Sequence, residues 1–405
     1  MKIMHKGRVA RMSKGFYDRL ELKLQDMRNA GKYKEYRHLM SPMAGHAQLR
    51  GKGDVMVLCS NNYLGLSDKE EIIQAGMEAL SKYGAGAASV RFICGTYDIH
   101  QELEELTAEF LGLESALTYT SCWNANTAVI PAILEPGDTV ISDALNHASI
   151  VDGCRLIPKG VNKMIYRHSD MNDLESKLKE SMGNGQRLVI TDGVFSMEGD
   201  IAKLKDIIYL VRKYDGILMV DDSHATGVIG RTGRGTAEYY DMLGEVDIIT
   251  GTYGKALGGA GGGFVAGRKQ ITDICIQNSR PHLFSNSLPP VLAAMAKAAL
   301  EYLSAHPEIV ESLINKTRYF RKLLKERKLN ILEGDSAIIP IMIYDTAKAI
   351  ATANCLFEEG IYVTGFGYPV VPEGEARIRL QVSDSLSYED IEKAADIIEK
   401  VVNRG

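Results

Sequence analysis

One lysine stands beside a cluster of glycines in the stretch IITGTYGKALGGAGGGF, residues 248–264. Lys255 follows a short apolar run, and glycine-rich backbone of this kind bends sharply or lets another group approach closely. A lysine held there is either a phosphate contact or a nucleophilic amine. The residues elsewhere in the chain must decide between these two chemistries.

Polar side chains follow the other β-like runs at the ends where those runs stop. In an open α/β sheet, ligands bind beyond the carboxyl ends of the strands, so such residues are expected to meet at one edge. The candidates are Ser121, Cys122, Trp123 and Asn124 after residues 116–120, His147 after 138–142, Ser196 after 187–191, Asp221 and His224 after 216–220, and Thr252 and Lys255 after 246–250.

A lysine, an aspartate and a D-x-x-H spacing at strand ends favour pyridoxal phosphate. This cofactor is held by a lysine amine, by an acid against its pyridine nitrogen and by backbone amides at its phosphate. A carboxylate such as Asp221 keeps that nitrogen protonated, because an opposite charge raises the pKa of the cation. A strand-to-helix turn at residues 121–124 would offer free N–H groups to the phosphate.

Competing motifs fail at particular positions. A P-loop needs Ser or Thr after its lysine, but Ala256 follows Lys255. GVFSMEG is no nucleophile elbow, because two residues separate Gly193 from Ser196. We expect no metal, because the adjacent acids at 221 and 222 point to opposite sides of a strand and leave too few convergent ligands.

The segments that must position these residues read as an α/β protein. Mostly continuous apolar runs at 116–120, 138–142, 187–191, 216–220, 246–250 and 262–267 suit strands buried on both faces. Residues 201–214 have helical periodicity between two of them. After residue 292 the sequence pattern is mainly that of helices. We expect an N-terminal arm at 1–60, a large domain at 61–292 and a small α+β domain at 293–405.

Composition excludes several classes. The net charge of −5 gives no basic stripe for nucleic acid, and no segment has the roughly 20 apolar residues that a membrane helix needs. The six cysteines form no C-x-x-C pair, which fits a reducing compartment. We expect the cytoplasm, or the mitochondrial matrix in a eukaryote. The basic residues within 1–17 are read as a solvated start of the chain.

Several motifs together resemble one enzyme family. DDSHATG, GTYGKALGG, SDALNHASIVDG, TDGVFSMEGD and FSNSLPP are similar to the α-oxoamine synthases, fold-type I pyridoxal-phosphate enzymes that condense an amino acid with an acyl-CoA. The likeness runs from about residue 13 to the C-terminus. It implies a large domain with a mostly parallel seven-stranded sheet, a smaller α+β C-terminal domain and a homodimer with shared active sites.

The resemblance assigns roles at matching positions. Lys255 is implied to hold the cofactor and later to move the substrate α-proton. Asp221 is implied to pair with the pyridine nitrogen and His224 to bond the phenolic oxygen. His147 is implied to stack on the cofactor, to take part in catalysis and to contact the substrate. Ser196 is implied to contact the cofactor near its phenolic oxygen.

Further positions are implied to hold the phosphate and the substrate. The phosphate contacts are Ser121, Cys122, Trp123 and Thr252, with Ser285 and Asn286 reaching it from the other subunit. Arg379 is implied to clamp the substrate carboxylate as a bidentate fork, with Asn61 nearby. The family pattern has a smaller aromatic ring where this chain has Trp123, and a backbone contact should survive that difference.

Within the family, ASVRFICGTYDIHQELE and IYVTGFGYPVVPEGEARIRLQ most resemble members that use glycine and acetyl-CoA. This implies formation of 2-amino-3-oxobutanoate and CoA, with the reverse cleavage completing threonine breakdown. Members with a longer acyl-CoA, such as 8-amino-7-oxononanoate synthase, 5-aminolevulinate synthase and serine palmitoyltransferase, remain the alternative. A non-catalytic partner subunit would lack Lys255, and a ligand-sensing module would carry a fused DNA-binding domain.

Overall fold

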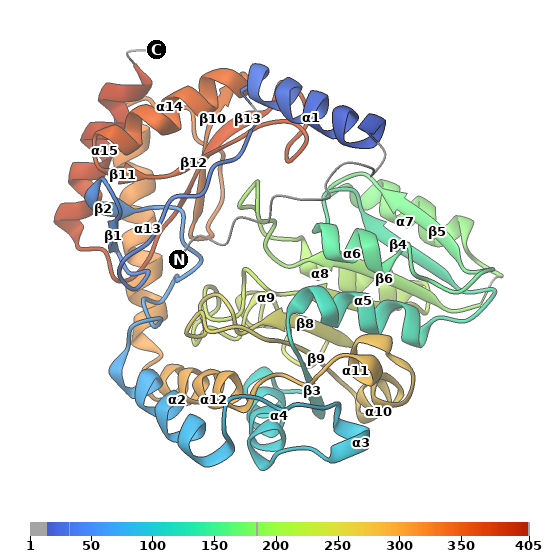
Figure 1. Cartoon of the computed structure of the whole chain (residues 1–405). Coiled ribbons are helices and arrows are strands. Elements are labelled where there is room, and N and C mark those ends of the chain that lie inside the picture. The colour runs from blue at the N-terminus through green and yellow to red at the C-terminus, as the bar shows by residue number, and fades with distance from the viewer. Residues whose placement is uncertain (1–13, 32, 184, 404–405) are drawn as a thin grey trace.

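A central sheet of seven strands organises the larger part of the molecule (Figure 1). The computed structural model describes residues 14–31, 33–183 and 185–403. Along the sheet the order is β3-β9-β8-β7-β6-β4-β5, and β9 alone runs antiparallel to its neighbours. The strands are β3 (Ser115–Tyr119), β4 (Thr139–Asp143), β5 (Asn162–Tyr166), β6 (Arg187–Asp192), β7 (Ile217–Asp221), β8 (Ile248–Thr252) and β9 (Gly263–Gly267).

The sheet is buried on both faces, as the continuous apolar runs predict. Neighbouring residues of one strand enter two different hydrophobic clusters: Leu188 lies in one and Val189 in the other. The edge strand β5 was not among the predicted strands. Its first residues, Asn162 and Lys163, are exposed, so the strand lacks a continuous apolar run.

Helices cover both faces of this sheet. One buried cluster joins it to α5 (Cys122–Ile133), α6 (Ala148–Gly153) and α10 (Lys269–Asn278). The other joins it to α2 (Glu70–Tyr83), α4 (Asp98–Leu111), α7 (Met171–Glu180), α8 (Leu204–Lys213) and α12 (Pro290–Ala305). The remaining short helices of this part are α3 (Arg91–Cys94), α9 (Thr236–Tyr239) and α11 (Arg280–Phe284).

Two small sheets lie in the part drawn at the upper left of Figure 1. One is antiparallel and consists of β10 (Ile338–Tyr344), β13 (Ala376–Gln381) and β12 (Thr364–Phe366). The other joins β1 (His46–Leu49) and β2 (Gly53–Val57) to β11 (Ile361–Tyr362). The N-terminal arm thus pairs with the C-terminal part of the chain. The helices here are α1 (Lys14–Asn29), α13 (Glu308–Glu326), α14 (Thr346–Glu358) and α15 (Tyr388–Val402).

A capping box begins the last helix, α15. The Ser387 hydroxyl accepts from the Asp390 amide, and the Asp390 carboxylate accepts from the Ser387 amide. The domain limits stay a prediction. The predicted boundary between the large and the small domain, at residues 292 and 293, falls within α12. Residues 1–13 of the proposed arm lie outside the described residues. No helix in the described part of the chain is long and apolar enough to cross a membrane.

Candidate active site

A cavity of about 200 Å³ lies at the carboxyl ends of the parallel strands. Residues that follow β3, β4, β6, β7 and β8 all reach it, as expected for an open α/β sheet. Its lining combines an amine, two carboxylates, two imidazoles and several hydroxyls. The lining residues are Ser121, Cys122, Trp123, His147, Ser149, Asp192, Val194, Asp221, Ser223, His224, Thr252 and Lys255.

Lys255 enters this cavity from the loop after β8. Burial lowers the pKa of its amine, although the nearby Asp221, Cys122 and Asp192 act in the opposite direction. A lysine amine with a lowered pKa is more often uncharged near neutral pH, which is the form that attacks a carbonyl carbon. The lysine predicted from the glycine-rich motif therefore has the surroundings of a nucleophile.

The Asp221 carboxylate, at the end of β7, is buried and accepts three hydrogen bonds. Asn126 Nδ2 donates to its Oδ2 at 2.6 Å, and the Cys122 thiol donates to the same oxygen at 3.6 Å. The Ser223 amide donates to Oδ1 at 2.9 Å. Three donors fix the position of the carboxylate in the cavity wall. It is therefore ready to face a cationic ring nitrogen.

The tautomer of His147 follows from its contacts. The Ser149 amide donates to His147 Nδ1, and the Ser149 hydroxyl lies 2.7 Å from the same nitrogen. Since a backbone N–H can only donate, Nδ1 carries the lone pair and the proton is on Nε2. Burial lowers the pKa of His147, so the ring is neutral. The Trp123 ring meets it edge-on, with centroids 5.8 Å apart.

His224 is buried beside a phenol. Tyr63 Oη lies 2.8 Å from His224 Nδ1, and Tyr63 Oη also accepts from Gln381 Nε2 at 2.7 Å. Burial lowers the pKa of His224 well below its usual value, and the cations of Lys255 and Arg379 lower it further. The imidazole is therefore neutral at physiological pH.

Arg379 approaches the same region from β13 of the small domain. Its Nη1 donates to the Ser196 carbonyl at 2.8 Å and its Nη2 to Gln381 Oε1 at 2.9 Å. Its Nε is buried and has no partner among the described residues, which leaves a donor for a carboxylate. Ser196 thus contributes its carbonyl to Arg379, and its side chain is not part of the cavity lining. Asn61 lies in this network through Gln381 Nε2, which donates to its Oδ1 at 2.7 Å.

The phosphate end of the predicted site coincides with the first turn of α5. Ser121 is the N-cap and accepts from the Asn124 amide. The first N–H groups of a helix have no partner within it and favour an anion. A Cβ at Gly263 would collide with the Cys122 amide, so glycine at this position keeps the turn in place. The Thr252 hydroxyl donates to the Gly262 carbonyl at 2.9 Å.

These observations fit pyridoxal phosphate. The cavity offers an amine, a fixed carboxylate and the first residues of a helix. Ser285 and Asn286 are not brought to this cavity. Both are exposed and line a separate small pocket with Tyr119 and His282. This placement suits residues that serve the other subunit, as the resemblance implies.

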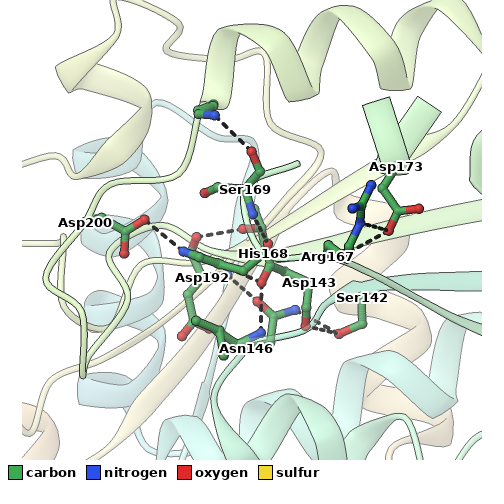
Figure 2. Close-up of polar contacts among 12 residues, drawn as sticks. Ser142, Asp143, Asn146, Arg167, His168, Ser169, Asp173, Asp192 and Asp200 are labelled. Carbon is green, nitrogen blue, oxygen red and sulfur yellow. Dashed lines mark hydrogen bonds and ion pairs between the residues drawn. The ribbon is translucent and has the colours of Figure 1, made fainter. Parts of the chain in front are cut away.

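A second polar network lies at the end of β4 (Figure 2). His168 Nδ1 lies 3.0 Å from Asp143 Oδ1 and its Nε2 lies 3.1 Å from Asp200 Oδ2. Asp192 accepts from the His147 amide, and burial raises its pKa well above the usual value. His168 thus ties the end of β4 to the loop that carries residues 193–201.

His168 should stabilise the fold in a pH-dependent way. Burial alone would lower its pKa, but its bonds to Asp143 and Asp200 raise it from 6.5 to about 10. The stabilisation is then complete below pH 6.5 and is lost as the pH rises through about 10. We expect His168→Gln to cost about 2 kcal/mol of unfolding free energy at pH 6 and less at pH 10.

Urea unfolding of both proteins at one protein concentration, between pH 6 and pH 10, measures this difference. A cost that stayed constant over that range would show that the charge on His168 does not contribute.

Comparisons with known proteins agree with this geometry. The family model for aminotransferase class I and II matches residues 53–398. The chain therefore belongs to this family, and within it to the pyridoxal-phosphate-dependent α-oxoamine synthases, as the sequence motifs predict.

Similar curated proteins include 2-amino-3-ketobutyrate coenzyme A ligase from Escherichia coli K12, 46% identical over 95% of this chain and 97% of that protein. The human mitochondrial protein of the same name is 45% identical over 94% and 91%. The 8-amino-7-oxononanoate synthase of Thermoanaerobacter pseudethanolicus is 42% identical over 95% and 96%. A solved structure of serine palmitoyltransferase from S. paucimobilis has a TM-score of 0.90 at 29% identity, covering 97% of this chain and 99% of that one.

Proposed function

We propose that this protein is a glycine C-acetyltransferase that condenses glycine with acetyl-CoA to 2-amino-3-oxobutanoate and CoA. The observation that carries the proposal is the convergence of Lys255, Asp221, His147 and His224 on one cavity, with Arg379 beside it. The high identity to 2-amino-3-ketobutyrate coenzyme A ligases from bacteria and mammals supports the choice of substrates.

Each residue of the site has a separate proposed role. Bound pyridoxal phosphate supplies an electron sink for negative charge at the substrate α-carbon. Lys255 would hold the cofactor, and its amine would take the α-proton of the amino acid as a general base. Asp221 would balance the charge of the pyridine nitrogen. His147 would contact the cofactor ring, and His224 would donate from Nε2 to the phenolic oxygen.

Arg379 orients the amino acid by its carboxylate, and Asn61 lies close enough to assist. The Nη1 and Nη2 atoms of Arg379 each use one of their two N–H groups within the chain, so a substrate carboxylate would bind to the remaining N–H donors. The side chain is also braced by the Phe366 ring, 4.8 Å from the guanidinium carbon. Such bracing reduces the freedom that is lost when the substrate binds.

A longer acyl-CoA is the second candidate. The identity to an 8-amino-7-oxononanoate synthase is only slightly lower than to the acetyl enzymes, and all these relatives share the Lys255 chemistry. Measurement of CoA release with glycine and a series of acyl-CoAs separates the two. The reverse cleavage would serve threonine degradation. We place the protein in the cytoplasm, or in the mitochondrial matrix of a eukaryote.

Arg379→Lys should raise the glycine KM with little change in cofactor affinity. Lysine keeps the charge but loses the planar fork that binds a carboxylate through two bonds. We expect an increase of about tenfold or more, which corresponds to one charge-assisted hydrogen bond. Steady-state kinetics with glycine and a cofactor titration of the same variant test this. An unchanged KM would remove Arg379 from the substrate site.

We also propose that the active unit is a homodimer in which Ser285 and Asn286 complete the phosphate site of the partner. Both residues are exposed, and they lie near the exposed apolar side chains of Phe284, Phe92 and Ile93. Exposed apolar groups gathered in this way mark an interaction surface.

Mixed dimers test the shared site. Lys255→Ala chains and chains with both Ser285→Ala and Asn286→Ala should each be nearly inactive alone. After subunit exchange, a mixed dimer has one intact site, so some of the activity should return. Mass spectrometry verifies that the subunits have exchanged. If no activity returns after verified exchange, the shared site is contradicted.

A further inference from the structure

Gln381 is the last residue of β13 and connects the two parts of the site. Its side chain lies on the same face of the strand as Arg379, because residues two apart in a strand point the same way. Its backbone amide donates to the Leu58 carbonyl at 2.8 Å, which anchors the end of the strand. The residue is almost completely buried. Its carboxamide therefore has no freedom to turn toward solvent.

The orientation of this carboxamide is fixed by its neighbours. Arg379 has only donors, so the atom of Gln381 that accepts from its Nη2 at 2.9 Å must be Oε1. The two protons on Gln381 Nε2 then go to Asn61 Oδ1 and to Tyr63 Oη, each at 2.7 Å. Both N–H donors of the Gln381 side chain and one lone pair of its Oε1 are therefore engaged in hydrogen bonds.

The direction of the next bond follows. Tyr63 Oη accepts from Gln381, and among the described residues its own proton has no acceptor other than His224 Nδ1 at 2.8 Å. Burial raises the pKa of Tyr63 to about 12, which keeps the phenol protonated. His224 is uncharged because burial lowers its pKa well below the usual value. With Nδ1 as acceptor, the single proton of the imidazole lies on Nε2.

We propose that Gln381 is a positioning residue: through Tyr63 it holds Arg379 and His224 in one directional hydrogen-bond chain and keeps the His224 proton on Nε2. The inference rests on the roles proposed above for Arg379 and His224. It adds that the small domain, which carries the carboxylate clamp, sets the protonation pattern of a residue in the large domain. His224 can then donate to a cofactor oxygen only while the chain is complete.

Two substitutions break the chain at different links. Gln381→Glu keeps the size of the side chain and still accepts from Arg379, but it cannot donate to Tyr63 or Asn61. The Tyr63 phenol is then expected to donate to the new carboxylate and to leave His224 Nδ1. Tyr63→Phe removes only the last link and leaves the bond between Arg379 and Gln381. Gln270→Glu, an exposed position on α10, controls for the added charge.

Nitrogen NMR of protein with labelled histidine reads the position of the proton directly, without turnover. The His224 signals are assigned from a His224→Gln sample. In the unmodified protein and in Gln270→Glu we expect a protonated Nε2 and an unprotonated, hydrogen-bonded Nδ1. In Gln381→Glu and Tyr63→Phe this pattern should be lost, with population of the other tautomer or of the cation.

Kinetics provide the second readout. Gln381→Glu places a competing carboxylate on Arg379, so the glycine KM should rise about tenfold or more, as for the loss of a charge-assisted bond. Tyr63→Phe should lower kcat with much less effect on this KM. If Gln381 had only a structural role, its substitution would lower stability without separating an effect on the glycine KM from an effect on kcat.

An unchanged His224 pattern in folded Gln381→Glu and Tyr63→Phe would overturn the inference, even if glycine and acetyl-CoA are the substrates. If the His224 pattern changes in the variants but the unmodified protein releases no CoA from acetyl-CoA, the inference about Gln381 is upheld and the proposed function is contradicted. If Gln381→Glu fails to fold, Tyr63→Phe alone decides, because its His224 pattern should change in the same way.

Discussion

Lys255→Ala is expected to reduce turnover by at least about a thousandfold, because it removes the amine that we propose both holds the cofactor and acts as the general base. Residual cofactor binding should remain, since Asp221 and the first turn of α5 are unchanged. Borohydride treatment of the unmodified protein should fix the cofactor on the peptide that contains Lys255. The exposed Lys205 on α8 provides a control, and Lys205→Ala should behave as the unmodified protein does.

Mass spectrometry of the reduced and digested protein locates the modified lysine. Modification at a different lysine, or a Lys255→Ala protein that keeps its turnover, would contradict the assignment of the catalytic amine.

Asp221→Asn is expected to lower kcat by at least about a hundredfold, a loss similar to that of one preorganised electrostatic contact. The carboxamide has nearly the same shape but cannot balance a protonated pyridine nitrogen. One of the two oxygens would also become an NH2 group, which cannot accept from either Asn126 or the Ser223 amide, so one of these hydrogen bonds is lost. Cofactor affinity should fall together with kcat.

The neighbouring residue gives a matched control. Asp222 is also buried, but its carboxylate accepts from the Thr236 amide and hydroxyl, away from the cavity. Asp222→Asn should therefore lower stability and leave cofactor affinity largely unchanged. Equal loss of cofactor affinity in both variants would mean that Asp221 has no special relation to the ring nitrogen.

The residues at the strand ends could be predicted because two simple rules locate them. Parallel strands end at one edge of the sheet, and apolar runs mark where those strands stop. Lys255, Asp221, His147 and His224 meet in the cavity as the motifs predict. The edge strand β5 was missed because three of its five residues are exposed.

The supporting residues could not be predicted from the motifs alone. Gln381 and Asn126 act through side-chain contacts between segments far apart in the sequence, and no local pattern marks such contacts. A periodicity signal did exist. Gln381 lies two residues after Arg379 on a strand, and Asn126 lies four residues after Cys122 on a helix, so each shares a face with a predicted site residue.

The position of Ser196 shows another limit. The family resemblance implies that Ser196, which follows β6, contacts the cofactor. In the structure its carbonyl accepts from Arg379. The sequence alone does not show whether a residue such as Ser196 acts through its side chain or through its backbone carbonyl. Contacts of Ser196 with the cofactor therefore remain a prediction.

The choice of substrates is tested most directly by CoA release from a panel of acyl-CoAs with glycine, alanine and serine. Because glycine has no side chain, a site built for it can pack close to the α-carbon and exclude larger amino acids by steric clash. The account predicts the highest kcat/KM for glycine with acetyl-CoA, with 2-amino-3-oxobutanoate as the product. Faster turnover of succinyl-, pimeloyl- or palmitoyl-CoA, or of alanine or serine, would contradict the proposed function.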